Sequence, residues 1–317
     1  MVTHESIREV SRSVCIEHLG LIGVGLIGGS LARALRQAGA VSHITGFSIN
    51  LPELKKAVEL GVIDAYAKNA AETVAGADMV VVAVPLGAMG SVFAEISPAL
   101  ANETVVTDVG SVKRCVIQDA RANLGRHWTR FVPAHPVAGT ERSGVAASFA
   151  QLFDRHRVVL TPLADTELGA VQRVAAMWES AGAVVECMSV DDHDLILAAS
   201  SHLPHVLAYV LVQTLATQAR CDDIFRLAAG GFADFTRIAS SDPRMWHEIV
   251  LANRDAILTI TERFGKNVEA LLSALRSGDG EGITKVFGNA KKVRDEFEAH
   301  RRKRGLGSSA PIPEARP

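Results

Sequence analysis

The sequence predicts an α/β fold, in which a Rossmann-like, doubly wound parallel sheet is followed by an all-helical domain. A short apolar run ends in the pattern Gly23-x-Gly25-x-x-Gly28 and continues directly into a helical segment. Strands and helices then alternate over about 170 residues, which is typical of a parallel sheet covered by helices. From Asp191 to about His300, by contrast, the apolar residues follow only helical spacing.

The length of 317 residues is consistent with two domains. We expect an N-terminal leader at 1–16, a dinucleotide-binding domain at 17–188, an all-helical substrate and dimerisation domain at 189–300, and a disordered tail at 301–317. The tail starts with the basic cluster Arg301-Arg302-Lys303-Arg304, which we expect to be solvated.

The composition argues against several classes of function. The net charge of −2 gives no electrostatic basis for binding nucleic acid or an acidic membrane. The four cysteines are far apart in the chain, so we expect free thiols in a reducing compartment. The N-terminus lacks the apolar core of a signal peptide, and we find no run of about 18 uncharged apolar residues. We therefore expect a cytoplasmic protein with no membrane or nucleic-acid partner.

The first strand, Ile16–Ile22, leads through the glycine turn into a helix that reaches about Ala38. In this turn Gly23 permits the tight bend, and Gly25 allows a pyrophosphate to approach the backbone. Gly28 allows helix and strand to pack closely. A glycine turn between a strand and a helix is the context that a dinucleotide site requires.

The later elements alternate in the same way. Asn50, with an acidic residue three positions on, indicates a helix start after a second strand at Val41–Phe47. Met79–Val84 is almost purely apolar, which indicates a strand buried on both faces. The other predicted strands are Thr104–Asp108, Phe131–Pro133, Val158–Leu160 and Val184–Cys187, with a helix at 165–181. The helices predicted beyond them are Ile196–Gln218, Asp223–Ala228, Pro243–Phe264, Val268–Arg276 and Gly282–Phe297.

The helix N-terminus after the glycine turn offers free N–H groups to phosphates, and loops at the carboxyl ends of other strands complete such a site. Where an acid would repel a 2′-phosphate, the chain has Ser48, but no arginine follows at 49 or 50. We therefore favour NADP slightly over NAD, or use of both. If Ser48 only caps its loop, NAD remains acceptable. The predicted cofactor contacts are Gly23, Gly25, Leu26, Ile27, Gly28, Ser48, Val84, Pro85, Leu86 and Ser111.

A hydride-transfer site needs a group that takes or polarises a hydroxyl proton, and a neutral imidazole does this near pH 7. His135 lies at a strand end and is our candidate; the alternative is a histidine held in a turn by backbone hydrogen bonds. Ser111 can contact substrate or nicotinamide, or it can be the N-cap of the following helix. We expect Lys113 to be an exposed helix residue.

In the helical half, His202 and His205 are three residues apart and face the same side of a helix. No further ligands stand near them in the sequence, so we expect no metal. Arg237 can bind a carboxylate through two N–H groups, or pair with Asp234 three residues before it. From these residues alone, the chain is a nicotinamide-dependent oxidoreductase that acts on a small anion.

Five motifs, taken together and in this order, resemble those of the prephenate and arogenate dehydrogenases of tyrosine biosynthesis, over roughly residues 17–297. They are Gly23-x-Gly25-Leu26-Ile27-Gly28-Gly29-Ser30, Asp108-x-Gly110-Ser111-Val112-Lys113, His135-Pro136-x-Ala138-Gly139-Thr140-Glu141-x-Ser143-Gly144, Ser201-His202-Leu203-Pro204-His205 and Gly231-Phe232-x-Asp234-Phe235-Thr236-Arg237-Ile238-Ala239. The segment Ser241-Asp242-Pro243-x-Met245-Trp246 follows.

The resemblance implies oxidative decarboxylation: a hydride leaves the ring carbon that bears the hydroxyl, carbon dioxide is lost, and the ring becomes aromatic. Prephenate would give 4-hydroxyphenylpyruvate, and arogenate would give tyrosine. By motif, His135 accepts a hydrogen bond from the ring hydroxyl with the help of Ser111, and Arg237 pairs with a carboxylate. The other implied substrate contacts are Thr140, Ser201, His202, His205 and Trp246. The resemblance also implies a homodimer formed through the helical domain.

Two positions depart from the family pattern. Ser48 replaces the acid of NAD-preferring members, and Ala233 stands where some members carry a basic residue, which leaves prephenate and arogenate open. Two other functions also stay open: a β-hydroxyacid-type dehydrogenase with Lys113 as the acid/base, and a non-catalytic NAD(P)-sensing regulator. The leading mechanism requires His135 and Arg237 to meet over the nicotinamide, and it predicts that activity falls at about pH 6–7 as the imidazole is protonated.

Overall fold

The computed structural model describes residues 15–303, which form two compact units, one up to Ile257 and one from Leu258 onward. The predicted leader at 1–16 lies outside the described residues except for Cys15 and Ile16. Of the predicted tail only Arg301–Lys303 are described, and they form the end of a helix. The boundary between the two compact units, at 257/258, differs from the domain boundary predicted at 188/189, which stays a prediction.

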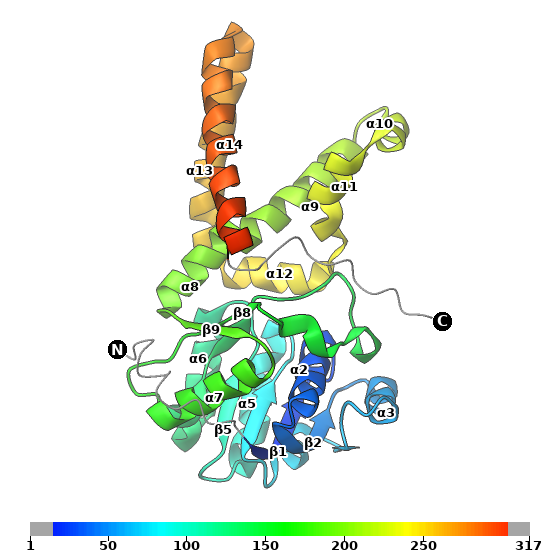
Figure 1. The fold of residues 1–317 in the computed structure, drawn as a ribbon, viewed down its shortest axis with the longest axis vertical. Coiled ribbons are helices and arrows are strands. Elements are labelled where there is room, and N and C mark those ends of the chain that lie inside the picture. The colour runs from blue at the N-terminus through cyan, green and yellow to red at the C-terminus, as the bar shows by residue number, and fades with distance from the viewer. Residues whose placement is uncertain (1–14, 304–317) are drawn as a thin grey trace. The chain divides into compact units, whose positions relative to one another are not determined.

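The first unit is built on a six-stranded parallel sheet with the strand order β3-β2-β1-β4-β5-β6 (Figure 1). This sheet confirms the predicted α/β, doubly wound fold class. The first two strands have the predicted bounds, whereas β4 ends at Val82, before the predicted end. The strands are β1 (Ile16–Ile22), β2 (Val41–Phe47), β3 (Ala65–Tyr66), β4 (Met79–Val82), β5 (Val105–Asp108) and β6 (Phe131–Val132).

Helices cover both faces of this sheet, which explains the unbroken apolar sequence of β4. Met79 and Val81 belong to the apolar core that includes α2 and α7, whereas Val80 and Val82 belong to the core that includes α4, α5 and α6. All four side chains are fully buried. The helices are α2 (Leu26–Gln37), α3 (Leu51–Glu59), α4 (Ala70–Val74), α5 (Met89–Ile96), α6 (Lys113–Asn123) and α7 (Leu168–Ser180). As predicted, Asn50 caps α3.

Three further strands form a separate small sheet: β7 (Ala134–Pro136), β8 (Arg157–Leu160) and β9 (Val184–Cys187). Strand β8 runs antiparallel to β7 and parallel to β9, so the predicted strands β8 and β9 belong to the α/β portion but not to the six-stranded sheet. The chain leaves the main sheet at Pro133, which has no N–H to extend a strand ladder. The Pro133 carbonyl instead accepts a hydrogen bond from the Thr161 amide at 3.0 Å. His135 is therefore carried on the small sheet.

Residues 188–303 form helices and contain no strand, as the sequence predicts. The long helix predicted from Ile196 contains a π-helical turn at Ala198–His202, and the helix predicted from Pro243 breaks at Asn253. Helix α11 was not predicted, because two glycines at its start lower helix propensity. The helices are α8 (Val190–Leu197), α9 (Leu203–Ala216), α10 (Cys221–Leu227), α11 (Gly230–Thr236), α12 (Pro243–Ala252), α13 (Arg254–Ser277) and α14 (Gly280–Lys303).

One apolar helical segment corrects the expectation that the chain has no run long and apolar enough to cross a membrane. Helix α8, the π-helical turn and α9 form a continuous helix of 27 residues, Val190–Ala216, which is long and apolar enough to cross a membrane by length and composition. The expectation that no such run exists is therefore wrong. The segment is weak evidence for a membrane, because the core helices of soluble proteins pass the same test, and because it carries ionisable side chains that bond to other elements. The four cysteines are free thiols, as expected.

Candidate active site

The glycine turn between β1 and α2 has the shape that a dinucleotide requires. Gly23 has a φ of +96°, and a Cβ there would lie 2.1 Å from the Ala83 carbonyl oxygen. A Cβ at Gly28 would lie 2.2 Å from the Gly23 oxygen, so both positions require glycine. At Gly25 a Cβ would meet nothing within 4 Å. This open space lies at the first turn of α2, where a phosphate can approach.

The amides at this helix end are free of side-chain caps. Gly25 is the N-cap residue of α2 and supplies no side-chain hydrogen bond to the helix, which begins with Leu26 and Ile27. Backbone N–H groups and the helix dipole both favour an anion at such a position. A pyrophosphate therefore fits this turn.

Ser48 follows the end of β2, where a doubly wound sheet usually carries the acid that binds the ribose of NAD. Its hydroxyl accepts a hydrogen bond from the Asn50 amide at 3.3 Å, so this residue does cap its loop. The neighbouring Ile49 side chain is 98% exposed. The predicted contacts at 84–86 follow β4, which pairs directly with β1, so they stand at the same sheet edge as the glycine turn.

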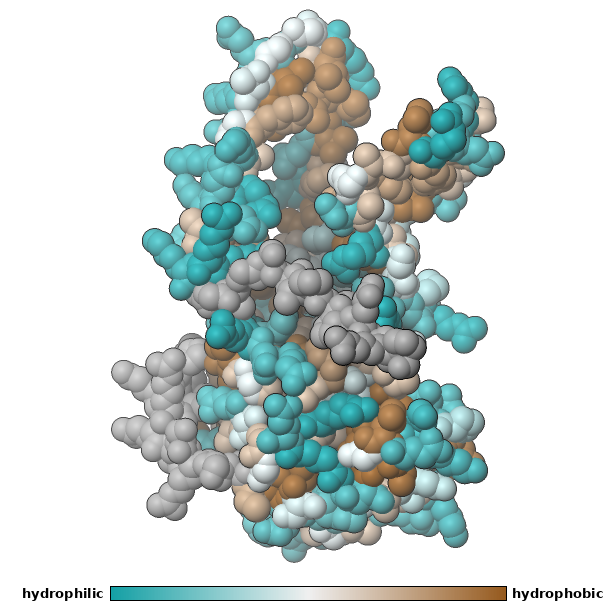
Figure 2. All heavy atoms as spheres, turned by 45° about the vertical axis from the view of Figure 1, so that its right-hand side comes forward, coloured by the Kyte–Doolittle hydropathy of each residue, from teal (hydrophilic) through white to brown (hydrophobic). Residues whose placement is uncertain are grey.

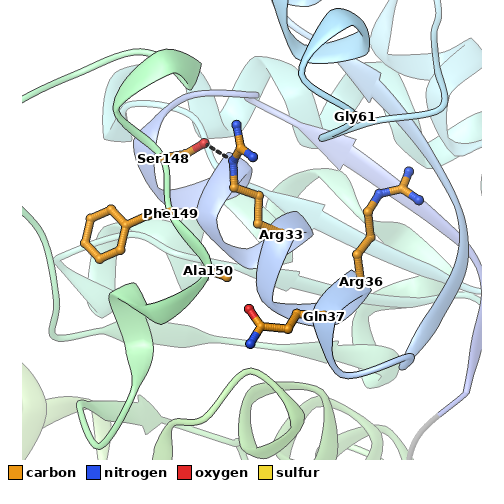
Figure 3. Close-up of a pocket in the computed structure, with 7 residues that line it drawn as sticks. All are labelled: Arg33, Arg36, Gln37, Gly61, Ser148, Phe149 and Ala150. Atoms are coloured by element: carbon orange, nitrogen blue, oxygen red, sulfur yellow. Dashed lines mark hydrogen bonds between the residues drawn. The ribbon is translucent and has the colours of Figure 1, made fainter. Parts of the chain in front are cut away.

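A separate hollow of about 460 Å³ lies between α2 and the segment 148–150 (Figure 3). Two guanidinium groups line it, and both are engaged. Arg33 Nε donates a hydrogen bond to Ser148 Oγ at 2.9 Å, and Arg36 forms an ion pair with Asp64 at 2.6 Å. Because its cations are paired within the protein, we assign no ligand to this hollow.

His135 is the outer member of a buried chain of three side chains. Its Nδ1 lies 2.8 Å from Nε2 of His193 in α8. Nδ1 of His193 lies in turn 2.7 Å from Oδ1 of Asp194. His135 itself is only 8% exposed. The alternative that backbone hydrogen bonds hold His135 in a turn is therefore wrong.

Asp194 also binds the start of α6. Its carboxylate accepts hydrogen bonds from the amides of Lys113, at 2.9 Å, and Arg114, at 3.0 Å. The N-cap position of α6 is Val112, so the alternative that Ser111 is the N-cap is wrong. Ser111 is half-buried in the loop between β5 and α6.

Lys113 is fully buried, which corrects the expectation of an exposed helix residue. Its Nζ donates hydrogen bonds to Asp108 Oδ2 at 2.5 Å and to the Ala134 carbonyl at 2.6 Å. The other Asp108 oxygen accepts a hydrogen bond from the Ala134 amide at 3.1 Å. This pair ties β5, α6 and β7 together immediately before His135. Two of the three N–H donors of this ammonium are engaged by these acceptors, and the alternative that Lys113 is the acid/base stays a prediction.

The two histidines of the helical segment meet at one indole ring. The ring of His202 lies 6.0 Å from that of Trp246, and His205 stacks on it at 3.7 Å, which confirms that both face the same side. Asn253 Nδ2 donates to His202 Nδ1 at 3.1 Å, and His205 Nδ1 donates to the Ser201 carbonyl at 2.9 Å. In the neutral rings these bonds leave a proton on His202 Nε2 and a free acceptor at His205 Nε2.

Burial favours the neutral form of these imidazoles. It lowers the pKa of His135 well below 6.5, and the charges of His193, Lys113 and His202 act in the same direction. It lowers the pKa of His202 to about 4, and it lowers the pKa of His193 despite the hydrogen bond to Asp194. The expectation that His135 titrates at about pH 6–7 is therefore corrected to a lower pH.

Arg237 follows α11 and forms an ion pair with Glu141, from the motif after β7, at 3.4 Å. It pairs with this residue and not with Asp234, so the alternative of a local helical pair is wrong. The Arg237 side chain is 63% exposed and that of Glu141 32%, and an ion pair this open to water contributes at most about 1 kcal/mol. Thr140 lies beside Glu141 and accepts a hydrogen bond from the Arg142 amide at 3.2 Å.

Arg237 and His135 stand at the two ends of a series of electrostatic neighbours. Burial is the main cause that lowers the pKa of His205. The charge of Arg237 acts in the same direction, whereas the hydrogen bond to Ser201 opposes both. The charge of His205 acts in the same direction on His202, and that of His202 on His135. Arg237 is thus an electrostatic neighbour of His205, and His202 is an electrostatic neighbour of His135.

Sequence reasoning missed the residues behind His135. His193 and Asp194 belong to an acidic first turn of α8, which in a sequence is indistinguishable from an ordinary solvated helix start. Asn253 interrupts two apolar helices and shows no motif of its own. Asp108 was the one sequence signal for this buried network, because it begins the motif Asp108-x-Gly110-Ser111-Val112-Lys113 and had been given no role.

Comparisons with known proteins agree with this geometry. The family description "Prephenate dehydrogenase, nucleotide-binding domain" matches residues 31–187, and "Prephenate dehydrogenase, dimerization domain" matches residues 189–289. Cyclohexadienyl dehydrogenase of Zymomonas mobilis is 38% identical over 285 residues, which cover 88% of this chain and 95% of the relative. Prephenate dehydrogenase of Bacillus subtilis is 35% identical over 277 residues, or 87% of this chain and 74% of the relative.

Solved structures give the same result. Prephenate dehydrogenase from Aquifex aeolicus, in complex with hydroxyphenyl propionate and NAD+, has a TM-score of 0.84 and 36% identity, covering 90% of this chain and all of the other. Arogenate dehydrogenase of Synechocystis has a TM-score of 0.74 and 25% identity, covering 88% and 99%. The chain therefore belongs to the prephenate dehydrogenase family of NAD(P)-dependent oxidoreductases.

Proposed function

We propose that this enzyme catalyses the NAD(P)-dependent oxidative decarboxylation of prephenate to 4-hydroxyphenylpyruvate, of arogenate to tyrosine, or of both. The observation that carries the proposal is the buried, neutral imidazole of His135, held from behind by His193. A neutral imidazole can accept a hydrogen bond from an alcohol and draw electron density onto its oxygen. The relatives named above act on these cyclohexadienyl substrates or bind a related ring.

In the proposed reaction, His135 accepts the hydrogen bond of the ring hydroxyl, and Ser111 assists from the loop before α6. The oxidised nicotinamide, when bound, supplies the acceptor for the hydride that leaves the hydroxyl-bearing carbon. Loss of the ring carboxylate as carbon dioxide then leaves an aromatic ring. The low exposure of His135 limits competition from water for its acceptor nitrogen.

Arg237 is proposed to bind a substrate carboxylate. The weak ion pair with Glu141 supports this role, because an exposed pair costs little to exchange for a second carboxylate. His205 and His202 lie between Arg237 and His135 in the electrostatic series, and their stacking on Trp246 gives them fixed orientations. We propose that the same pocket is lined by Thr140, Ser201, His202, His205 and Trp246.

For the cofactor, we infer use of both NADP and NAD, with NADP slightly favoured. Ser48 carries no charge to repel a 2′-phosphate, which removes the main discrimination against NADP. Its hydrogen bond to Asn50 supports a loop that also accepts NAD. The proposed contacts are Gly23, Gly25, Leu26, Ile27, Gly28, Ser48, Val84, Pro85, Leu86 and Ser111.

We infer a cytoplasmic homodimer formed through the helical segment. Large apolar side chains are exposed on the α9–α11 helices and on the α13–α14 hairpin, each considered by itself, and Figure 2 shows apolar surface on both. Exposed apolar patches of this kind mark interaction surfaces. The exposed residues include Val210, Phe225, Leu227, Phe235, Leu272, Val286, Phe287 and Val293. Light scattering should give twice the chain mass of 33.7 kDa.

Steady-state rates for the four pairs of substrate and cofactor test the proposal. The wild-type enzyme should reduce NADP or NAD in the presence of prephenate or arogenate and release carbon dioxide. The His135→Asn variant should lose roughly 10²–10⁴ in kcat, the range for a lost acid–base group. A wild-type enzyme that binds cofactor but turns over neither substrate would instead support the non-catalytic regulator.

A further inference from the structure

Two buried side chains with no role in the reaction as proposed so far lie directly behind His135. His193 is fully buried and Asp194 is 6% exposed, so neither side chain is accessible to a substrate that arrives from solvent. They form a single chain with His135, with contacts of 2.8 Å between the two imidazoles and 2.7 Å between His193 and the carboxylate. This geometry decides where each proton sits.

The carboxylate end of the chain is charged. Burial alone would raise the pKa of Asp194, but hydrogen bonds from His193 and from the amides of Lys113 and Arg114 outweigh it, and the pKa is lowered. An ionised carboxylate can only accept hydrogen bonds. His193 must therefore carry its proton on Nδ1. Because burial keeps this ring neutral, its Nε2 has no proton and must accept a hydrogen bond.

Within residues 15–303, the ring atom that faces this acceptor is His135 Nδ1, at 2.8 Å, which must therefore be the donor. A neutral imidazole with its proton on Nδ1 has a bare Nε2. We propose that Asp194 and His193 are positioning residues that hold His135 in the tautomer whose Nε2 is the hydrogen-bond acceptor for the substrate hydroxyl. This inference rests on the proposed function and states how its acceptor is prepared.

The same chain supports the proton step. When His135 Nε2 takes the hydroxyl proton, the O–H bond breaks and its electron pair stays on the substrate oxygen. The resulting imidazolium donates its Nδ1 proton to the hydrogen bond with His193. Burial lowers the pKa of His193, and Lys113 acts in the same direction, whereas the hydrogen bond to Asp194 and the charges of Asp194 and Asp108 favour the protonated ring. The hydrogen-bonded chain that ends at the Asp194 carboxylate therefore stabilises the imidazolium of His135.

The tautomer can be measured without any turnover. In the ¹⁵N NMR spectrum of the wild-type enzyme labelled at histidine, the His135 ring is identified as the signal that the His135→Asn variant lacks. Either neutral tautomer gives two widely separated nitrogen shifts, so each shift is assigned to Nδ1 or Nε2 through its coupling to the ring carbon protons. We expect the shift of a protonated nitrogen at Nδ1 and that of a bare nitrogen at Nε2. A protonated Nε2 in the neutral ring would overturn the proposal.

A pair of variants at His193 tests the consequence for catalysis. His193→Phe keeps the ring but removes the acceptor, and we expect kcat to fall by roughly 10²-fold or more, with little change in KM. His193→Gln restores an amide oxygen that accepts from His135 Nδ1 and an NH₂ group that donates to Asp194, so it should retain a larger kcat than the Phe variant. The matched control is His127→Phe, a buried histidine in the 125–130 segment, which should leave kcat and the His135 tautomer as in wild type.

The outcomes separate this inference from the proposed function. A wild-type enzyme with the expected tautomer but no turnover of prephenate or arogenate would refute the function and leave the tautomer assignment standing. An active wild type whose His193→Phe variant turns over as fast as the His127→Phe control would refute the positioning role. If His193→Phe does not fold, the ¹⁵N tautomer of His135 in the wild-type enzyme carries the test, and a His193→Gln variant as slow as His135→Asn contradicts the positioning role.

Discussion

Removing the Lys113 ammonium should destabilise the protein far more than an ordinary loss of a surface ion pair. The Lys113→Met substitution keeps an unbranched apolar stem but leaves the Asp108 carboxylate without its counter-ion, in a place where both side chains are fully buried. Asp108 would retain only the amides of Gly110, at 2.6 Å, and Ala134, at 3.1 Å. Breaking a buried pair in this way costs about 3–5 kcal/mol.

The measurement is thermal and urea unfolding followed by circular dichroism. For a domain of this size, each kcal/mol corresponds to roughly 2–4 °C, so Tm should fall by about 6–20 °C. The matched control is Lys56→Met. Lys56 pairs with Glu59 at the surface, where the two side chains are 51% and 65% exposed, so this pair should contribute less than about 1 kcal/mol. The double variant Lys113→Met with Asp108→Asn should recover part of the loss, because no uncompensated charge remains.

Two results would refute this reasoning. If Lys113→Met loses no more stability than Lys56→Met, the buried pair does not hold β5, α6 and β7 together. If the double variant is as unstable as the single one, the loss comes from packing and not from the stranded carboxylate. Because Ala134 precedes His135, we also expect the single variant to lower kcat below the temperature at which it unfolds.

The remaining predictions concern pH, substrate and cofactor. Activity should stay constant as pH falls through the ordinary histidine pKa of about 6.5 and should decrease only at lower pH, because burial lowers the pKa of His135 and the neutral ring is the active form; a kcat profile that already falls above pH 6.5 contradicts this. The free energy of unfolding should decrease as pH falls below about 6.5, since the unfolded chain binds protons that buried His202, with a pKa of about 4, does not. Its share is about 2 kcal/mol at pH 5, and urea titrations at pH 7.5 and 5 should show a smaller difference for His202→Gln. Arg237→Gln should raise the KM for substrate by roughly 10–100-fold, the value of a charge-assisted hydrogen bond, with Tm unchanged; an unaltered KM would remove Arg237 from the site. Ser48→Asp should raise the KM for NADP by roughly tenfold or more and leave that for NAD within about threefold, and equal changes for both cofactors would show that residue 48 does not face the 2′ position.

The sequence predicts those parts of the fold that depend on local pattern. The apolar run at 79–84 predicts a doubly covered strand because each of its side chains must enter one of two cores, and the structure divides them between those cores. The glycine turn was predictable for the same reason, since steric clashes at Gly23 and Gly28 are set by the strand and helix on either side. The separate sheet of β7, β8 and β9 was not, because strand direction depends on partners chosen far along the chain.

In the candidate active site, too, the sequence predicts the residues that lie in local motifs but not their partners from distant segments. His135 and Arg237 could be named from motifs, because each lies in a local pattern at the end of an element. The groups that act on them come from afar: His193 is 58 residues from His135, and Asp194 is 81 from Lys113. Lys113 was misassigned as exposed because a lysine at a helix start is usually solvated, and only its contact with Asp108 and the Ala134 carbonyl makes burial favourable.

The π-helical turn at Ala198–His202 sets the rotational phase of the helix on which the site depends. In an unbroken α-helix each residue adds about 100° of rotation, so His193 and His202 would project about 180° apart. The wider turn reduces that angle, and His202 reaches Asn253, which also donates to the Asp194 carbonyl at 2.7 Å. Deleting one residue from 198–201 would rotate His202 and His205 by about a quarter of a revolution relative to His193 and Asp194, although every contacting side chain would still be present. Helix length between residues 193 and 205 is thus as much a requirement of this enzyme as the identity of its histidines.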